Sequence, residues 1–153
     1  MDRTAPPPAS LPSTSDTPSI RPVRLRCNDT IDPVGIDRLP PLLSWELDGT
    51  DTEIRQTAWQ VVATDARTGA ALWDSGKTQS DRTLQIPYGG PALRSRESVI
   101  WRVRVWDDAD VAGPFSACAR FEAGLLHESD WRAKWIGNPR GATDVDHPVP
   151  APC

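Results

Sequence analysis

Apolar and polar residues alternate with a period of two along three stretches of the chain, 42–47, 58–64 and 99–106. Successive side chains of a β-strand point to opposite faces of a sheet, so each stretch predicts a strand with one buried face. The expected inward rows are Leu43, Trp45 and Leu47; Trp59, Val61 and Ala63; and Val99, Trp101, Val103 and Val105. We expect Trp45, Trp59 and Trp101 to fill the core.

Four shorter segments also have strand character, and turns rich in Gly and Pro separate all of these segments. The shorter candidates are 23–27, 71–74, 83–86 and 117–122. About seven short strands with regular turns in one domain are typical of a fibronectin-III or immunoglobulin-like sandwich. The predicted fold class is therefore all-β, with a single sandwich.

The composition changes on both sides of this region. Residues 1–21 are rich in Pro, Ser and Thr and predict a disordered tail, because such a segment buries too little apolar surface to offset its ordering entropy. The sandwich is expected over 22–125. Residues 126–153 form an irregular tail, interpreted as a linker and the start of a following domain, with one helical turn capped by Ser129 or Asp130.

Two tryptophans, Trp131 and Trp135, lie four residues apart in this C-terminal tail. Neither belongs to a predicted strand, so we interpret them as docking anchors for a neighbouring domain. The alternative is that they pack back on the edge of the sandwich.

Charge and hydropathy exclude several classes of partner. The net charge is −4 and no basic run occurs, which argues against nucleic acid or an anionic membrane as a partner. No apolar stretch approaches the roughly 18 residues of a membrane span. The N-terminus lacks the apolar segment of a secretory signal, so a cytoplasmic location is the expectation.

The three cysteines, Cys27, Cys118 and Cys153, have no spacing typical of a metal site. Cys27 and Cys118 fall in predicted strands and are expected to be buried free thiols. No metal and no cofactor is expected.

The chain offers little for catalysis. Its two histidines, His127 and His147, both lie beyond the predicted sandwich, and no phosphate-binding glycine motif occurs. The acidic residues in 107–110 do not follow the spacing of a calcium loop, so we interpret them as a solvated hairpin turn. We therefore expect no catalytic residue in this chain.

A carbohydrate-binding module is the alternative function, because some sandwiches bind sugars by stacking them on exposed aromatic rings. Trp73 and Trp106 are the candidates, since Trp106 falls on the face opposite Trp101. The partner would be a glycan.

Seven ordered segments resemble the N-terminal part of bacterial α-L-rhamnosidases of glycoside hydrolase family 78. They are PVGID (33–37), PLLSWEL (41–47), QTAWQV (56–61), LWDSGK (72–77), WRVRVWD (101–107), FEAGLL (121–126) and SDWRAKWIG (129–137). The resemblance implies a fibronectin-III-like N-terminal domain with a structural role. It also implies that hydrolysis of terminal α-L-rhamnose belongs to a downstream barrel, which this chain lacks. On this interpretation the chain is truncated before the catalytic domain, and its partners are the downstream domains of the parent glycosidase, in cis or missing.

Overall fold

The three alternating stretches each form a long strand in the computed structural model, which describes residues 20–49 and 55–133. Six further strands and one 3₁₀ turn complete the described part of the chain. The strands are β1 (Ile20–Cys27), β2 (Val34–Ile36), β3 (Leu42–Gly49), β4 (Ala58–Asp65), β5 (Ala71–Asp74), β6 (Thr78–Gln79), β7 (Ile86–Pro87), β8 (Ser98–Trp106) and β9 (Ala119–Ala123).

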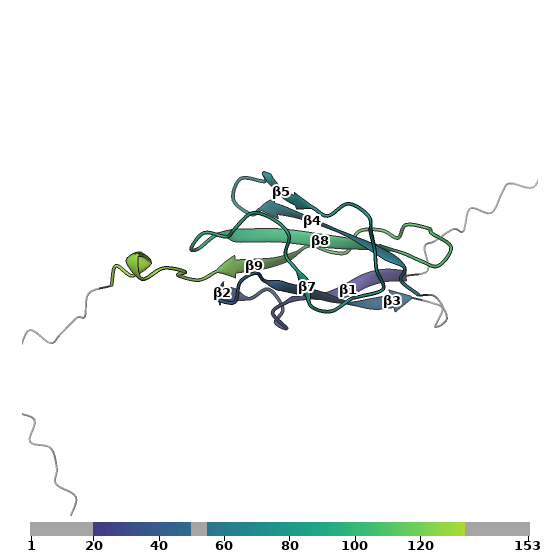
Figure 1. The fold of residues 1–153 in the computed structure, drawn as a ribbon, viewed down its shortest axis with the longest axis horizontal. Helices are drawn as coiled ribbons and strands as arrows, with labels where there is room; N and C mark the ends of the chain where they lie inside the picture. The colour runs from purple at the N-terminus through teal and green to yellow at the C-terminus, as the bar shows by residue number, and fades with distance from the viewer. Residues whose placement is uncertain (1–19, 50–54, 134–153) are drawn as a thin grey trace, which may run out of the picture.

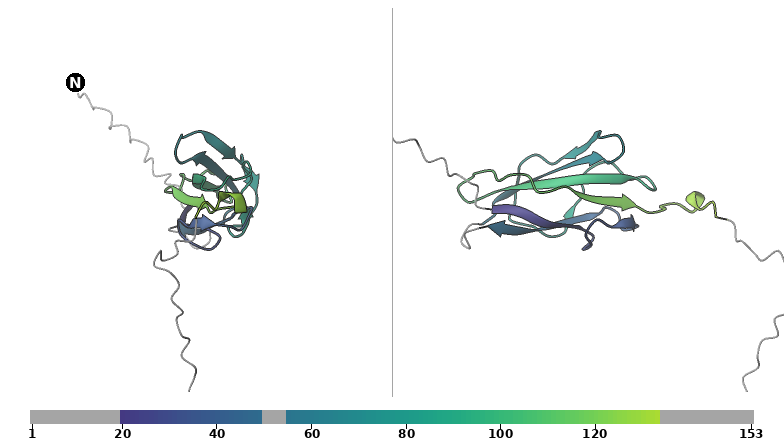
Figure 2. Two further views of the ribbon diagram at one scale, coloured as in Figure 1. Left: turned by 90° about the vertical axis from the view of Figure 1, so that its left-hand side faces the viewer. Right: turned by 180° about the vertical axis from the view of Figure 1, so that it is seen from behind.

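These strands form two sheets that pack face to face (Figures 1 and 2). The smaller sheet has the order β1-β3-β7, and the larger has the order β2-β9-β8-β4-β5, with β6 paired to β4. All pairs are antiparallel except β2 with β9. The sandwich begins with β1 at one end, and the segment after β9 leaves from the opposite end (Figure 1). The predicted all-β sandwich is confirmed.

Strands β4 and β8 place their apolar rows side by side. Val61 is opposite Val103 and Ala63 is opposite Trp101, so both rows face the smaller sheet. Trp45 comes from that sheet and meets Trp59 edge to face, with ring centroids 6.0 Å apart. The largest of the fully buried side chains are Trp45, Trp101, Phe121, Leu43, Val61, Val99, Val103, Val105, Pro41 and Cys27.

The strand predicted at 71–74 is confirmed as β5, but other shorter strands differ from their predicted positions. The strand expected at 83–86 is replaced by the two-residue β7, because Gln85 has a φ of 54° and interrupts the extended backbone. The strand expected at 117–122 begins at Ala119 instead. Strands β2 and β6 were not predicted, since segments of three and two residues are too short to show alternation.

Two further expectations about single residues are wrong. Ile20 and Arg21 were assigned to the tail, but both belong to β1, where Ile20 is buried. Leu47 was placed in the inward row of β3, but its side chain is exposed. The alternating pattern therefore extends one residue pair further along β3 than the buried surface does.

The remaining predictions for the tails, the disordered segment 1–19 and the irregular segment 134–153, lie outside the described residues. Within the described ranges, no helix is long and apolar enough to cross a membrane.

Candidate docking surface

The chain leaves the larger sheet through residues 124–131, here called the exit segment, which follow β9 beyond the end of the sandwich (Figure 1). The predicted helical turn is present as η1 (Glu128–Asp130), a single 3₁₀ turn. Its N-cap is His127 rather than Ser129 or Asp130. The Asp130 carboxylate instead accepts a hydrogen bond from the backbone N–H of His127, at 3.2 Å.

Trp131 follows directly after η1, and 68% of its surface is exposed. Its backbone N–H donates to the carbonyl oxygen of Glu128, at 3.1 Å, and this bond closes the turn, which ends at the extended backbone of Trp131. A large exposed indole at the end of an ordered segment is suited to packing against another surface. Trp135, the second predicted anchor, lies outside the described residues.

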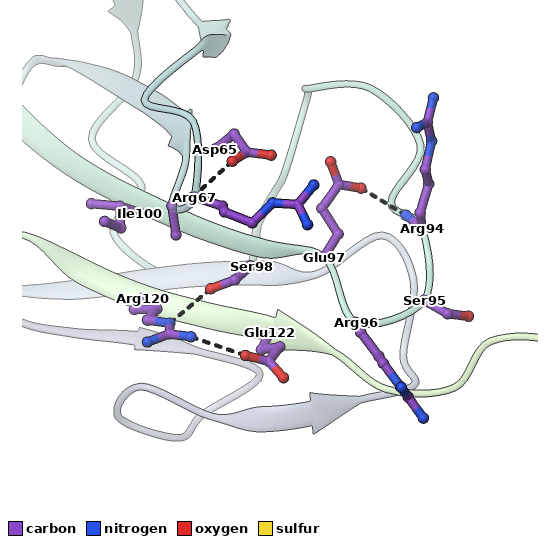
Figure 3. A pocket seen from close by; sticks show the side chains of 11 residues that line it. Asp65, Arg67, Arg94, Ser95, Arg96, Glu97, Ser98, Ile100, Arg120 and Glu122 are labelled. Atoms are coloured by element: carbon purple, nitrogen blue, oxygen red, sulfur yellow. Dashed lines mark hydrogen bonds and ion pairs between the residues drawn. The ribbon is translucent and has the colours of Figure 1, made fainter. Parts of the chain in front are cut away.

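A shallow cleft of about 620 Å³ lies on the larger sheet at the same end as the exit segment (Figure 3). Its walls come from the turn after β4, from the 94–97 turn before β8, and from β8 and β9 themselves. The lining side chains that carry charge are Asp65, Arg67, Arg94, Arg96, Glu97, Arg120 and Glu122.

Each acid in this cleft is already hydrogen bonded. Asp65 accepts the backbone N–H groups of Thr68, at 2.7 Å, and Arg67, at 2.8 Å, and these bonds lower the pKa of its carboxyl group. Glu97 accepts the backbone N–H of Arg94, at 2.7 Å, and Glu122 pairs with Arg120, at 3.0 Å. Each acid of the cleft is therefore already engaged by a neighbouring donor, and none stands free as a candidate catalytic acid.

Three guanidinium groups at the cleft, those of Arg67, Arg94 and Arg96, form no ion pair with any of the described residues. In Figure 3, Arg67 extends toward Glu97, whereas Arg94 and Arg96 extend to opposite sides of their turn. These arginines were not singled out from the sequence. They are spread over two turns that only the fold brings together, and no local motif marks them.

The stacking candidate Trp106 is not an open platform. Its side chain is only 8% exposed, and the ring is faced by the ammonium group of Lys77 at 5.1 Å and by the guanidinium of Arg104 at 4.9 Å. Arg104 also lies 4.9 Å from the Phe115 ring, and Arg102 lies 4.6 Å from the same ring. Cations and aromatic rings thus alternate along this outer face and cover each other.

Trp73 is half-buried and packs on the core instead of facing solvent as a flat surface. It is opposite Ala63 in the β4–β5 pair, which directs it inward, and it meets Tyr88 edge to face at 5.4 Å. The backbone of Gly89 lies so close that a Cβ atom there would be 2.8 Å from the Trp73 ring. The two rings predicted to stack on sugars are therefore both occupied by the protein.

The acidic residues of 107–110 form a turn. Asp107 is buried, and its carboxylate accepts the backbone N–H groups of Ala109, at 3.0 Å, and Val111, at 2.8 Å. The expectation of a solvated turn is therefore wrong for Asp107. Asp110 is exposed and pairs with Lys77. In the described part of the chain, no three acidic, His or Cys side chains are grouped as metal ligands would be.

The two described cysteines are both free, but only one is buried. Cys27 lies in the core at the end of β1, where burial raises the pKa of its thiol to about 12. Cys118 was expected to be buried in a strand, but it is exposed and precedes β9.

The two facing sheets, their filled interior and the ordered exit at one end define an immunoglobulin-like β-sandwich domain. A family model for the N-terminal immunoglobulin domain of Rha78A-like proteins matches residues 22–127. The chain belongs to this family, which confirms the resemblance noted from the sequence.

Relatives and solved structures agree with this assignment. The chain is 40% identical to an α-L-rhamnosidase of Streptomyces avermitilis over 116 residues, which cover 74% of this chain and 11% of the relative. It is also 40% identical to an α-L-rhamnosidase of Formosa agariphila over 111 residues, or 70% of this chain and 12% of the relative.

The crystal structure of the Streptomyces avermitilis α-L-rhamnosidase complexed with L-rhamnose superposes with a TM-score of 0.74 and 37% identity, covering 79% of this chain and 12% of that one. The α-L-rhamnosidase structure from Dictyoglumus thermophilum gives a TM-score of 0.70 and 36% identity, covering 78% of this chain and 14% of that one. The chain thus spans roughly an eighth of these relatives.

Proposed function

We propose that the chain is the non-catalytic accessory sandwich of an α-L-rhamnosidase-like glycoside hydrolase and that its role is to pack against the neighbouring domains. The parent protein would hydrolyse terminal α-L-rhamnose with residues outside this chain. The observation that carries the proposal is Trp131, whose side chain is 68% exposed at the point where the chain leaves the sandwich.

The non-catalytic part of the proposal is supported by the state of the acidic side chains. Glycoside hydrolysis generally needs one carboxyl group held protonated and a second carboxylate across the scissile bond. In the cleft beside the exit segment, Asp65, Glu97 and Glu122 all accept hydrogen bonds or ion pairs from neighbouring groups, and those of Asp65 lower the pKa of its carboxyl group. Elsewhere, Asp107 is used to hold its own turn.

The packing role is supported by the chemistry of the same end of the molecule. Trp131 provides apolar area, and Arg94 and Arg96 provide unpaired guanidinium groups on the adjacent turn. Tryptophan and arginine are both residue types that protein interfaces favour. The partner is the domain that follows in the parent protein, with Trp135 as a second anchor.

The proposal is tested by comparing Trp131 in two contexts. One is the chain alone, and the other is a chimera in which residues 20–133 replace the matching segment of the Streptomyces avermitilis α-L-rhamnosidase. Trp131→Ala should lower the melting temperature of the chimera and leave that of the chain alone unchanged, because only the chimera offers a surface for the indole.

Val111→Ala is the matched control, since Val111 is an exposed apolar residue in the turn after β8, at the opposite end of the sandwich. Val111→Ala should change the melting temperature of neither the chain alone nor the chimera. A chimera that melts at the same temperature with and without the Trp131 indole would contradict the packing role.

A further inference from the structure

We propose that Ser95 is a positioning residue that sets the direction in which the chain leaves the sandwich, by fixing the exit segment to the 94–97 turn. The inference rests on the proposed function for its purpose, because a preset direction matters when another domain follows. Its geometry is independent of any partner.

The Ser95 hydroxyl makes two hydrogen bonds to the exit segment. It accepts the backbone N–H of Leu126, at 2.8 Å, and it donates to the carboxylate of Asp130. That carboxylate also accepts the backbone N–H of His127, at 3.2 Å. One side chain from a turn more than thirty residues earlier in the sequence thus holds both ends of the segment that leads to Trp131.

The turn that carries Ser95 is itself tied to the end of β9. The backbone N–H of Arg96 lies 3.1 Å from the carbonyl oxygens of both Ala123 and Gly124. The backbone N–H of Ala123 donates to the backbone carbonyl oxygen of Glu97, at 2.9 Å. On the other side, the N–H of Gly124 donates to Ile36 of β2, at 2.8 Å. The exit segment therefore starts from a point that is fixed from two directions.

Only a hydroxyl group among the small side chains can fill this role, because it accepts one hydrogen bond while it donates another. Alanine would lose both bonds, whereas threonine would keep both. The Ser95 hydrogen bond also lowers the pKa of the Asp130 carboxyl group, as do the His127 N–H and the nearby charges of His127 and Arg96. The carboxylate is thus ionised and a strong acceptor at neutral pH.

The consequence is a preset position for Trp131. Without the Ser95 contacts, Gly124 would be the last residue of the exit segment that is hydrogen bonded to the sandwich, and residues 125–130 would regain backbone freedom. With them, the exposed indole is presented at one place relative to the arginines of the 94–97 turn. A following domain that docks there pays less ordering entropy.

Hydrogen exchange of backbone amides in the full chain tests the inference directly. In Ser95→Ala, the amides of Leu126 and His127 should exchange about tenfold faster than in the wild type, which corresponds to the loss of about 1.4 kcal/mol of hydrogen-bond stabilisation. Exchange at Val103, in the centre of β8, should stay the same. Ser95→Thr should restore slow exchange at both amides.

Ser116 provides a matched control, because its hydroxyl also accepts a backbone N–H, from Val103 at 3.1 Å, and donates to a carbonyl oxygen. Ser116→Ala should speed exchange near Val103 and leave Leu126 unchanged. The inference is overturned if Leu126 exchanges freely in the wild type or at the same rate in Ser95→Ala. If Ser95→Ala speeds exchange at Leu126 but Trp131→Ala leaves the melting temperature of the chimera unchanged, the positioning role stands and the proposed function fails.

Discussion

The indole N–H of Trp45 donates a hydrogen bond to the side-chain oxygen of Gln56 across 3.0 Å, inside the core. The amide group of Gln56 donates in turn to the carbonyl oxygens of Ser80, at 3.2 Å, and Arg82, at 3.0 Å. Gln56 is only 4% exposed. A single buried glutamine therefore connects the central tryptophan of the smaller sheet to the segment between β6 and β7.

Replacing Gln56 by alanine should destabilise the domain by about 1–3 kcal/mol, because the buried indole N–H of Trp45 and two partly buried carbonyl oxygens lose their partner. Urea unfolding measured by far-UV circular dichroism gives this value. Gln79→Ala is the control, since Gln79 is exposed on β6, and its effect should be small. Equal stability of the two variants would show that the buried network contributes nothing.

Trp45→Ala should cost about 3–5 kcal/mol, since it leaves a large cavity between the sheets and also removes the partner of Gln56. That is a large share of the stability of a small domain. Thermal unfolding of the variant reports the loss as a lower melting temperature. An unchanged melting temperature would mean that Trp45 is not a core residue.

The long strands and the four-residue β5 were predictable from sequence, whereas β2 and β6 were not, for a physical reason. In β4 and β8 one face is buried along the whole length, so residues such as Val61 and Val103 leave a clear period of two. Strands β2 and β6 exist because neighbouring strands offer hydrogen-bonding partners, and no side-chain pattern of their own marks them. The prediction that Leu47 is buried was wrong, because alternation shows which face of the sheet a side chain occupies but not where the covering sheet ends.

The docking end was predictable only in part. A tryptophan in a segment without strand character indicated Trp131, which is exposed, and its role as a docking anchor stays a prediction. The role of Ser95 had no local signal, because its partners Leu126 and Asp130 lie in a distant part of the sequence. The sugar-stacking candidates failed because sequence alternation placed Trp106 on an outer face but could not show that Lys77 and Arg104 cover it.

The thiols of Cys27 and Cys118 should differ sharply in reactivity, which a disulfide reagent measures in a Cys153→Ser background. The thiolate is the reactive form. Burial raises the pKa of Cys27 to about 12, so between pH 7 and about 9 its thiol stays protonated as well as shielded. We expect one thiol, the exposed Cys118, to react in the native chain, and Cys27 to react only after unfolding. Equal rates in the native state would contradict the burial of Cys27.

Titration with L-rhamnose should leave the tryptophan fluorescence of the chain unchanged. Both stacking candidates are occupied, Trp73 by Tyr88 and Trp106 by the two cations. The same titration of Lys77→Ala serves as the comparison, because this change uncovers one side of the Trp106 ring. A saturable change in the wild-type chain that disappears in Trp106→Ala would instead support a carbohydrate-binding module.

Tryptophan and valine side chains fill the space between the two sheets. We therefore infer that the chain acts through its surface and not through a catalytic cleft. The most direct measurement is hydrolysis of an aryl α-L-rhamnoside by the purified full chain. We predict no release of the aryl group above the rate in buffer. Turnover that persists through purification and disappears in the destabilised Trp45→Ala variant would contradict the account.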